Sequence, residues 1–250
     1  MHLILTGATG VVGSAVLRAM LIAPMVTKVT ILSRRRVLQA EGQSKVDVVI
    51  HQDFENYNAE LMERLKDANG CVWALGIGQN AASKADYIRI NKSYTLSFAN
   101  ALANTTGRNT PYIFIFISGE GATHSPGPLT TLYGRIKGET EIALLSLSNS
   151  VINGQDTLRV YVVRPGAVDP SDQPDIRDFI PKKGGVLGTI EPPVRAVMSV
   201  IYKRMHTPSK EMGQAIVTLA TGTGGPLKAK GVEGGGRIVT NIGLRNLAGL

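Results

Sequence analysis

The most informative segment for the fold is Leu3-Ile-Leu-Thr-Gly-Ala-Thr-Gly-Val-Val-Gly-Ser14. An apolar run breaks into three spaced glycines, Gly7, Gly10 and Gly13, and a helix-like stretch follows at once. This strand–turn–helix pattern predicts a dinucleotide site: Gly7 would allow a tight turn, Gly10 a close approach of backbone to phosphate, and Gly13 close packing of helix on sheet. The amino end of the helix would face the pyrophosphate, with Thr9, Val11 and Val12 beside it.

Apolar runs typical of strands alternate with helix-like stretches along the chain. Near-continuous apolar strands of this kind indicate a parallel sheet covered on both faces. We therefore expect an α/β, doubly wound, mostly parallel sheet in a single domain over residues 1–250, with a core of 1–170 and a substrate-side and C-terminal segment of 171–250. The expected strands are His2–Leu5, Lys28–Leu32, Val46–Ile50, Cys71–Leu75, Tyr112–Ile117 and Leu158–Val163, and the expected helices are Val11–Ala23, Asn58–Lys66, Ser83–Ala103 and Leu132–Leu147.

The pattern weakens after Pro165. Residues Pro192–Met205 favour one more helix, opened by prolines in its first turn. Residues Gly222–Gly236 have the glycine-rich composition of a loop. We expect the end of the chain, from Arg237, to return as a strand and a short helix.

Composition excludes several classes of protein. The chain has 250 residues, 43% of them hydrophobic, and no apolar window long enough for a membrane span. A single cysteine, Cys71, rules out an internal disulfide, and we expect no metal. The net charge is +8, but only Arg34, Arg35 and Arg36 form a basic run, so we expect an enzyme handling a phosphorylated cofactor and no nucleic acid. We expect a cytoplasmic protein.

The end of the second strand, Ser33-Arg34-Arg35, indicates which cofactor binds. An acidic residue there would bind the free 2′-hydroxyl of NAD, whereas arginine matches the 2′-phosphate of NADP. Arg34 and Arg35 therefore favour NADP(H), with a solvated basic loop as the alternative. Further residues follow strands three and four: we expect Asp53 and Phe54 near the adenine, and Ala74, Leu75 and Gly76 near the nicotinamide ribose.

Tyr133 and Lys137 stand four residues apart on one predicted helix and so share a face. The helix follows the fifth strand and a loop rich in Gly, Ser and Pro, which is where a substrate-facing helix should begin. A phenol with an ordinary pKa near 10 is a weak acid–base catalyst at neutral pH, and lowering that pKa to about 7 requires about 4 kcal/mol. We expect Lys137 to supply much of this.

The chain resembles the short-chain dehydrogenases/reductases, in particular the compact, atypical branch that includes the Tat-interacting-protein type of oxidoreductase. The resemblance covers residues 1 to about 170. It is carried, in family order, by TGATGVVG, the SRR end of strand two, HQDF, WALGIGQN, DYIRINKSY, FISGEGA, YGRIKGETE and VVRPGAV.

The resemblance implies a role for each matching residue. Tyr133 would protonate a carbonyl oxygen, Lys137 would hold the ribose hydroxyls, and Asn91 would hold Lys137 through water. Pro165 and Gly166 would pack near the carboxamide. The family usually has two adjacent hydroxyl residues at the end of strand five, whereas here Ser118 is followed by Gly119. The hydroxyl that polarises the substrate would therefore come from Ser118, or from Thr123 or Ser125, or the site would be impaired.

Two functions fit this pattern best. The first is an NADP(H)-dependent oxidoreductase that transfers hydride between the nicotinamide and a small-molecule carbonyl or alcohol substrate, with no membrane partner and a homodimer as a possible assembly. The alternative is a non-catalytic regulatory protein that senses NADP(H). A nucleotide-sugar epimerase or dehydratase ranks last, because it needs a larger C-terminal substrate domain.

Overall fold

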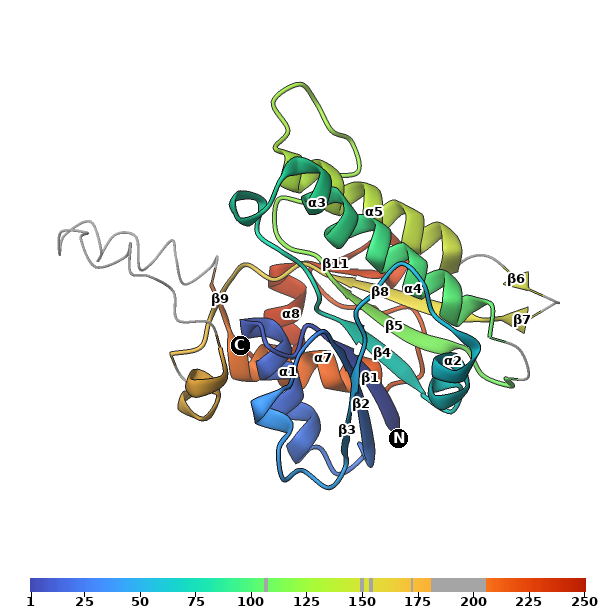
Figure 1. Ribbon diagram of the computed structural model, residues 1–250. Coiled ribbons are helices and arrows are strands. Elements are labelled where there is room, and N and C mark those ends of the chain that lie inside the picture. Colours follow the sequence, from blue (N-terminus) through green and yellow to red (C-terminus); the bar gives the residue numbers. More distant parts are fainter. Residues whose placement is uncertain (106–107, 149–150, 153–154, 172, 181–205) are drawn as a thin grey trace.

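The central element is an eight-stranded sheet in the order β11-β12-β8-β5-β4-β1-β2-β3 (Figure 1). The structure is a computed structural model that describes residues 1–105, 108–148, 151–152, 155–171, 173–180 and 206–250. The pairs between neighbouring strands are parallel except for β11 with β12, which is antiparallel. This is the predicted doubly wound, mostly parallel sheet.

The six predicted strands form close to their expected positions. They are β1 (His2–Thr6), β2 (Lys28–Ser33), β3 (Val46–Ile50), β4 (Gly70–Trp73), β5 (Tyr112–Ile117) and β8 (Leu158–Val163). The sheet is extended by the short strands β12 (Ile238–Val239) and β11 (Val232–Glu233). Two small pairs lie outside it: β6 (Val151–Ile152) with β7 (Gln155–Asp156), and β9 (Ala167–Asp169) with β10 (His206–Pro208).

Helices cover both faces of the sheet. One face carries α1 (Val11–Ile22), α7 (Ser209–Ala220) and α8 (Asn241–Leu247), whose side chains join one apolar cluster. The opposite face carries α2 (Ala59–Leu65), α4 (Tyr94–Ala103) and α5 (Leu132–Ser148) in a second cluster. Figure 1 shows α4 and α5 lying side by side above the sheet, with α1 and α7 below it.

Strand β5 illustrates how the sequence divides the two cores. Successive side chains of a strand point to opposite faces. Ile113, Ile115 and Ile117 therefore enter the cluster of α1 and α7, while Tyr112, Phe114 and Phe116 enter the cluster of α4 and α5. All six are buried, so this strand lies at the centre of the molecule.

The predicted helix over Ser83–Ala103 is divided into three parts. It consists of α3 (Lys84–Ile88), a π-helical turn η3 (Arg89–Ser93) and α4. The Ser83 side chain caps α3 by accepting a hydrogen bond from the backbone N–H of Asp86 at 3.1 Å. Such π-turns insert an extra residue into a helix and often occur at functional sites.

The C-terminal third differs in part from expectation. Helix α7 is missing from the sequence-based prediction, although its buried Met212, Ala215, Ile216 and Leu219 recur at helical spacing. It packs closely on α1: a Cβ atom at Gly213 would lie only 2.6 Å from the Ala15 carbonyl oxygen.

The strand and short helix expected after Arg237 are β12 and α8. The predicted loop at Gly222–Gly236 includes β11 and a short 3₁₀ turn, η6 (Gly234–Gly236), and the helix predicted for Pro192–Met205 lies outside the described residues.

Candidate functional site

The glycine turn connects β1 to α1 and is shaped by three backbone constraints. Gly7 adopts a φ of +70°, and a Cβ atom there would lie 2.6 Å from the backbone nitrogen of Leu75. A Cβ atom at Gly13 would overlap the Gly7 carbonyl group. At Gly10, by contrast, the nearest atom would be 3.5 Å away. Gly7 and Gly13 therefore close the turn on itself, while the Gly10 position leaves the amino end of α1 accessible, which suits a pyrophosphate.

A pocket of about 450 Å³ opens beside this turn, at the carboxyl ends of β1 and β2. Seven of the predicted cofactor-binding residues line this pocket. These are Gly7, Thr9, Ser33, Arg34, Arg35, Phe54 and Leu75. The end of each strand in a parallel sheet meets the same edge, which is where open α/β sheets bind ligands.

The basic residues of the pocket have different environments. Arg34 and Arg35 are exposed, and Arg35 Nη2 lies 3.3 Å from Thr9 Oγ1 across the pocket. Arg36 is instead paired with Glu41. Two cations therefore line the pocket, and they could bind a phosphate on the ribose.

Of the residues that follow β3, some line the pocket and one does not. Phe54 is buried and lines the pocket, and Gln52 lines it as well. Asp53 is not among the lining residues. Its carboxylate accepts hydrogen bonds from Asn56 Nδ2 at 2.8 Å and Glu55 N at 3.0 Å. These bonds lower the pKa of Asp53 and fix the turn. A contact of Asp53 with adenine stays a prediction.

The segment after β4 joins the pocket to the predicted catalytic residues. Thr6 Oγ1 accepts a hydrogen bond from Leu75 N at 3.2 Å. This bond connects the ends of β1 and β4, and Ala74 is the residue between β4 and Leu75. A Cβ atom at Gly76 would lie 2.9 Å from Asn91 Oδ1 and 3.9 Å from Lys137 Nζ. Leu75 lines the pocket and Gly76, its neighbour, lies against Asn91 and Lys137.

Asn91 and Lys137 are both buried, with 1% and 7% of their surfaces exposed. The Asn91 side-chain amide donates to Tyr87 O at 3.0 Å and Ile77 O at 3.2 Å from within the π-turn. Lys137 Nζ donates to Ile117 O, the last carbonyl of β5, at 3.0 Å. The bond to Ile117 O places the ammonium group at the carboxyl end of β5.

Tyr133 lies one turn before Lys137 on α5, against the backbone that follows β5. Its backbone N–H donates to Gln79 Oε1 at 3.0 Å, which anchors the start of the helix. A Cβ atom at Gly119 would overlap the Tyr133 hydroxyl oxygen and lie 3.7 Å from Pro165 O. Gly166 follows Pro165, and its N–H donates to Thr207 Oγ1 at 3.0 Å. Tyr133, Gly119 and Pro165 thus meet at one point.

The pKa values of the two helix residues move in opposite directions for the same reason. Burial raises the pKa of Tyr133 to about 12, and neighbouring acidic groups, Tyr87 first, act in the same direction. Burial lowers the pKa of Lys137 to about 8. Both shifts favour the uncharged form. A lowering of the Tyr133 pKa by Lys137 stays a prediction.

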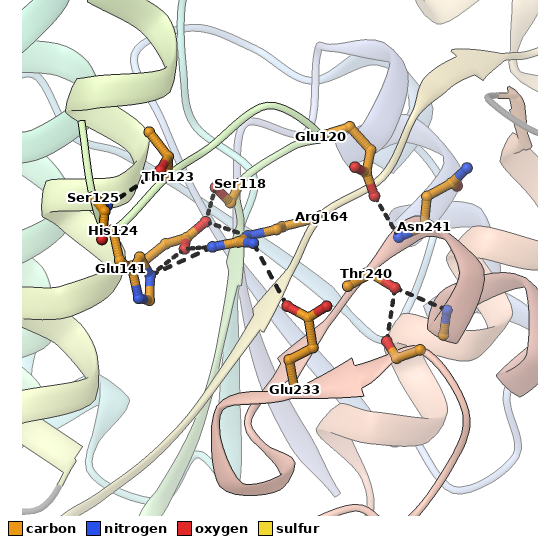
Figure 2. Close-up of polar contacts among 12 residues, drawn as sticks. Ser118, Glu120, Thr123, His124, Ser125, Glu141, Arg164, Glu233, Thr240 and Asn241 are labelled. Carbon is orange, nitrogen blue, oxygen red and sulfur yellow. Dashed lines mark hydrogen bonds and ion pairs between the residues drawn. The ribbon is translucent and has the colours of Figure 1, made fainter. Parts of the chain in front are cut away.

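Ser118 belongs to a buried cluster centred on Glu141 (Figure 2). The Ser118 hydroxyl donates to Glu141 Oε1, and Glu141, on α5, is fully buried. Arg164 Nε donates to the same carboxylate at 3.0 Å, and His124 Nε2 lies 2.7 Å from its other oxygen. The single proton of Ser118 is therefore directed to Glu141. A direct role for Ser118 at the substrate stays a prediction.

The two other candidate hydroxyls lie in the loop that crosses α5. Thr123 Oγ1 accepts a hydrogen bond from Ser125 N at 3.2 Å in a local turn, and Ser125 is exposed. The loop is fixed on the helix, because Thr123 N donates to Gly134 O at 3.1 Å and a Cβ atom at Gly138 would overlap the Thr123 carbonyl group.

Sequence reasoning left three site residues without a role. Glu141 and Arg164 lie within the quoted KGETE and VVRPGAV stretches, and Gln52 lies within HQDF. A signal for Glu141 was available: it follows Lys137 by four residues and so continues the buried face of the helix. Nothing comparable marks Gln52.

Two classes of feature are absent from the part of the chain that the structure describes. No group of three or more His, Cys, Asp and Glu side chains there could hold a metal ion. Among the same residues, no helix is long and apolar enough to cross a bilayer.

Comparison with known proteins gives relatives along the whole chain. No protein-family model matches. The leucinostatins biosynthesis cluster protein T of Purpureocillium lilacinum is 31% identical over 262 aligned positions, which cover 98% of this chain and 94% of that protein. The botcinic acid biosynthesis cluster B protein 16 of Botryotinia fuckeliana is 38% identical over 58% of this chain and 91% of its own length. The cytoplasmic location and the Tat-interacting-protein branch stay predictions.

A solved structure supports the fold. An oxidoreductase of the short-chain dehydrogenase/reductase family from Burkholderia thailandensis superimposes with a TM-score of 0.62 at 19% identity, over 97% of this chain and 92% of that one. The chain thus has the Rossmann-type fold seen in short-chain dehydrogenases/reductases, and by sequence it belongs to the family of the leucinostatins biosynthesis cluster protein T.

Proposed function

We propose that this protein is an NADP(H)-dependent oxidoreductase that transfers hydride between the nicotinamide and a small carbonyl or alcohol. One observation carries the proposal: Leu75 lines the pocket that contains Arg34 and Arg35, while the next residue, Gly76, lies against Asn91 and Lys137. A molecule extending from the arginines along this segment would reach Lys137 and Tyr133. That path suits an extended dinucleotide, whose two ends lie far apart.

The residues present fit the cofactor. Gly10 leaves space at the amino end of α1 for a pyrophosphate, with Val11 and Val12 opening the helix. Arg34 and Arg35 would hold a 2′-phosphate, and Lys137 would hold the ribose hydroxyls next to the nicotinamide. When bound, the reduced cofactor supplies a hydride to the carbonyl carbon of the substrate.

Tyr133 would supply the matching proton. In the reducing direction, the hydride forms the new C–H bond, the C=O π pair moves to oxygen, and the Tyr133 hydroxyl gives its proton to that oxygen. Burial raises the pKa of Tyr133 and so opposes this proton transfer, which makes a nearby positive charge necessary for the phenol to act as a general acid. The buried Lys137 ammonium, near the phenol on the same helix face, would stabilise the phenolate left behind.

The names of the two relatives assign those proteins to biosynthesis clusters. This supports a biosynthetic role for the present chain, with an intermediate of a biosynthetic route as the carbonyl or alcohol.

A binding and turnover experiment tests the proposal. We expect calorimetric titration to detect NADPH binding, and a panel of carbonyl compounds to include one that oxidises NADPH in the presence of the protein. Tyr133→Phe should abolish that turnover and leave the NADPH Kd within about threefold, because Tyr133 does not line the pocket that contains the two arginines. Absence of heat with either nicotinamide cofactor would refute the proposal.

The second candidate is an NADP(H)-sensing protein without catalysis. It is favoured by Ser118, whose hydroxyl is directed to Glu141 rather than to a substrate. NADPH binding without oxidation across a broad panel of carbonyl compounds would support the sensor over the enzyme.

A further inference from the structure

Residues 75–79, which lie just after β4 and are called the linking segment below, contact one part of the candidate site after another. Leu75 lines the pocket that contains the two arginines. A Cβ atom at Gly76 would lie 2.9 Å from Asn91 Oδ1, and the side-chain amide of Asn91 donates to Ile77 O at 3.2 Å. The linking segment thus leads from the cofactor pocket to the residues beside the proposed catalytic helix.

The last residue of the linking segment, Gln79, bonds to the first turn of that helix. Its side-chain oxygen Oε1 accepts a hydrogen bond from the backbone N–H of Tyr133 at 3.0 Å, across 54 positions of the chain. A backbone N–H can bond only to an acceptor, so the amide of Gln79 must turn its oxygen toward α5. Gln79 is otherwise exposed, and it begins a short 3₁₀ turn, η2 (Gln79–Ala81).

Tyr133 needs such a partner because it is the second residue of α5. The N–H groups of the first turn of a helix have no carbonyl partner within the helix. Thr131 supplies acceptors for the two residues that follow Tyr133: its Oγ1 accepts from Gly134 N at 3.1 Å, and its carbonyl oxygen accepts from Arg135 N at 3.0 Å. The N–H of the proposed proton donor is held instead by a side chain of the linking segment.

The bond from Tyr133 to Gln79 positions the helix start and contributes little to the stability of the fold. Because Gln79 is exposed, its replacement removes no buried contact. The middle of α5 is held on the sheet independently, by the buried pair of Glu141 and Arg164. What depends on Gln79 is the direction of the first turn, from which the Tyr133 side chain projects.

We propose that Gln79 is a positioning residue that holds the first turn of α5, and with it the Tyr133 phenol, on the segment that leads from the cofactor pocket. A cofactor lying along residues 75–79 restrains this segment, and Gln79 passes that restraint to Tyr133. The coupling to the cofactor rests on the proposed function, whereas the holding of Tyr133 by Gln79 does not.

The first test measures the bond itself. Hydrogen exchange of the Tyr133 amide is followed by NMR in the full chain, unchanged and as Gln79→Ala, Gln79→Glu and Asn80→Ala. We expect Gln79→Ala to speed this exchange about threefold to tenfold, because one hydrogen bond is lost. Gln79→Glu keeps an acceptor oxygen at the same reach and should restore the slow rate.

Asn80→Ala is the matched control, because Asn80 is the exposed neighbour of Gln79 in η2, and it should leave the exchange of the Tyr133 amide unchanged. An unchanged rate in Gln79→Ala, or an equally fast rate in Gln79→Glu, would overturn the inference.

The second test adds NADPH to the same proteins. Binding should slow exchange of the Tyr133 amide about threefold or more in the unchanged protein and in Asn80→Ala, and by a clearly smaller factor in Gln79→Ala. The same slowing in all three proteins would overturn the coupling. Failure to bind NADPH would refute the proposed function, and the exchange rates without cofactor would still decide whether Gln79 holds Tyr133.

The third test is kinetic and uses a carbonyl compound found in the turnover panel. We expect Gln79→Ala to lower kcat about fivefold or more, because small misplacements of a reacting group are costly to the rate. The NADPH Kd and the urea midpoint should change little, which separates positioning from a structural role. Gln79→Glu should keep kcat within about threefold of the unchanged protein. An unchanged kcat in Gln79→Ala, or equal losses in both variants, would contradict the positioning role.

Discussion

The guanidinium of Arg164 and the carboxylate of Glu141 meet below the surface, with Nε 3.0 Å from Oε1 and a second contact between Nη2 and Oε2. The pair links the end of β8 to the middle of α5, the helix that carries Tyr133 and Lys137. Hydrogen bonding to Glu141 raises the pKa of Arg164 further. The pair therefore contributes to the position of α5 on the sheet.

Glu141→Gln should destabilise the fold by about 3–5 kcal/mol, because the largely buried guanidinium loses its buried counter-charge and keeps only the exposed Glu233 at 4.0 Å. Glu139→Gln provides the control on the same helix: Glu139 pairs with Lys92 at 2.7 Å at a partly exposed site, and its loss should cost less than about 1 kcal/mol. Urea unfolding followed by circular dichroism measures both. Equal losses for the two variants would contradict a structural role for the buried pair.

Replacing Arg34 and Arg35 by Asp and Ser should weaken NADPH binding. Each hydrogen bond to a charged group contributes about 1.5–3 kcal/mol of binding free energy, so each bond lost should raise the NADPH Kd about tenfold or more. NADH binding should change by less than about threefold. The single tryptophan, Trp73, reports binding, because its ring centre lies 6.2 Å from that of Phe54 in the pocket wall. Quenching of its emission during titration gives both Kd values.

Arg36→Ser is the control for the cofactor variants, since Arg36 pairs with Glu41. We expect it to change both affinities by less than about threefold. Parallel losses of NADPH and NADH affinity in the Arg34 and Arg35 variant would mean that the pair does not bind the 2′-phosphate.

Lys137→Met should abolish turnover and raise the Tm. Burial lowers the pKa of Lys137 to about 8, so at pH 7 the folded protein holds an ammonium in an unfavourable place. Removing that charge should stabilise the fold, and each kcal/mol corresponds to about 2–4 °C in a chain of this size. Scanning calorimetry at pH 7 checks this, with the half-exposed Lys92→Met expected to show no such gain. A lower Tm for Lys137→Met would show that its hydrogen bond to Ile117 O outweighs the cost of burying the charge.

His2 should make the protein acid-sensitive. Burial is the main reason that its pKa falls to about 4 from 6.5, so the folded state favours the neutral ring. The resulting stability is present above pH 6.5 and is lost as the pH falls toward 4, by about 2–3 kcal/mol in total. Urea midpoints between pH 7 and pH 4 should fall less steeply for His2→Leu than for the unchanged protein. Parallel pH curves would exclude this contribution.

The sequence predicts the parts of this protein that repeat a simple period. Strands β1, β2, β4, β5 and β8 are largely buried on both faces, and their apolar runs show this directly, whereas β3 at the sheet edge is only partly buried. The glycine turn is equally legible, because Gly7 and Gly13 leave no room for side chains. Helix α7 could have been predicted as well, because Met212, Ala215, Ile216 and Leu219 follow the helical period. What the sequence does not show is that Gly213 packs against the backbone of α1.

The candidate site is predictable only in part, because side-chain pairing between distant segments leaves no local pattern. Tyr133, Lys137 and Asn91 follow from motifs, but the bond from Ser118 to Glu141 depends on how α5 lies across β5. The pKa of Tyr133 likewise depends on burial, which no motif encodes.

Helix α5 meets the loop before it through main-chain atoms at Gly134 and Gly138, where Cβ atoms would approach the carbonyl oxygens of Gly121 and Thr123. At these two points the contact does not depend on the side chains of the loop, although His124 and Thr131 also bond to α5 through theirs. Residues 125–129 can therefore vary in size and polarity without shifting the helix, so substrate preference can diversify while the reacting groups keep their positions.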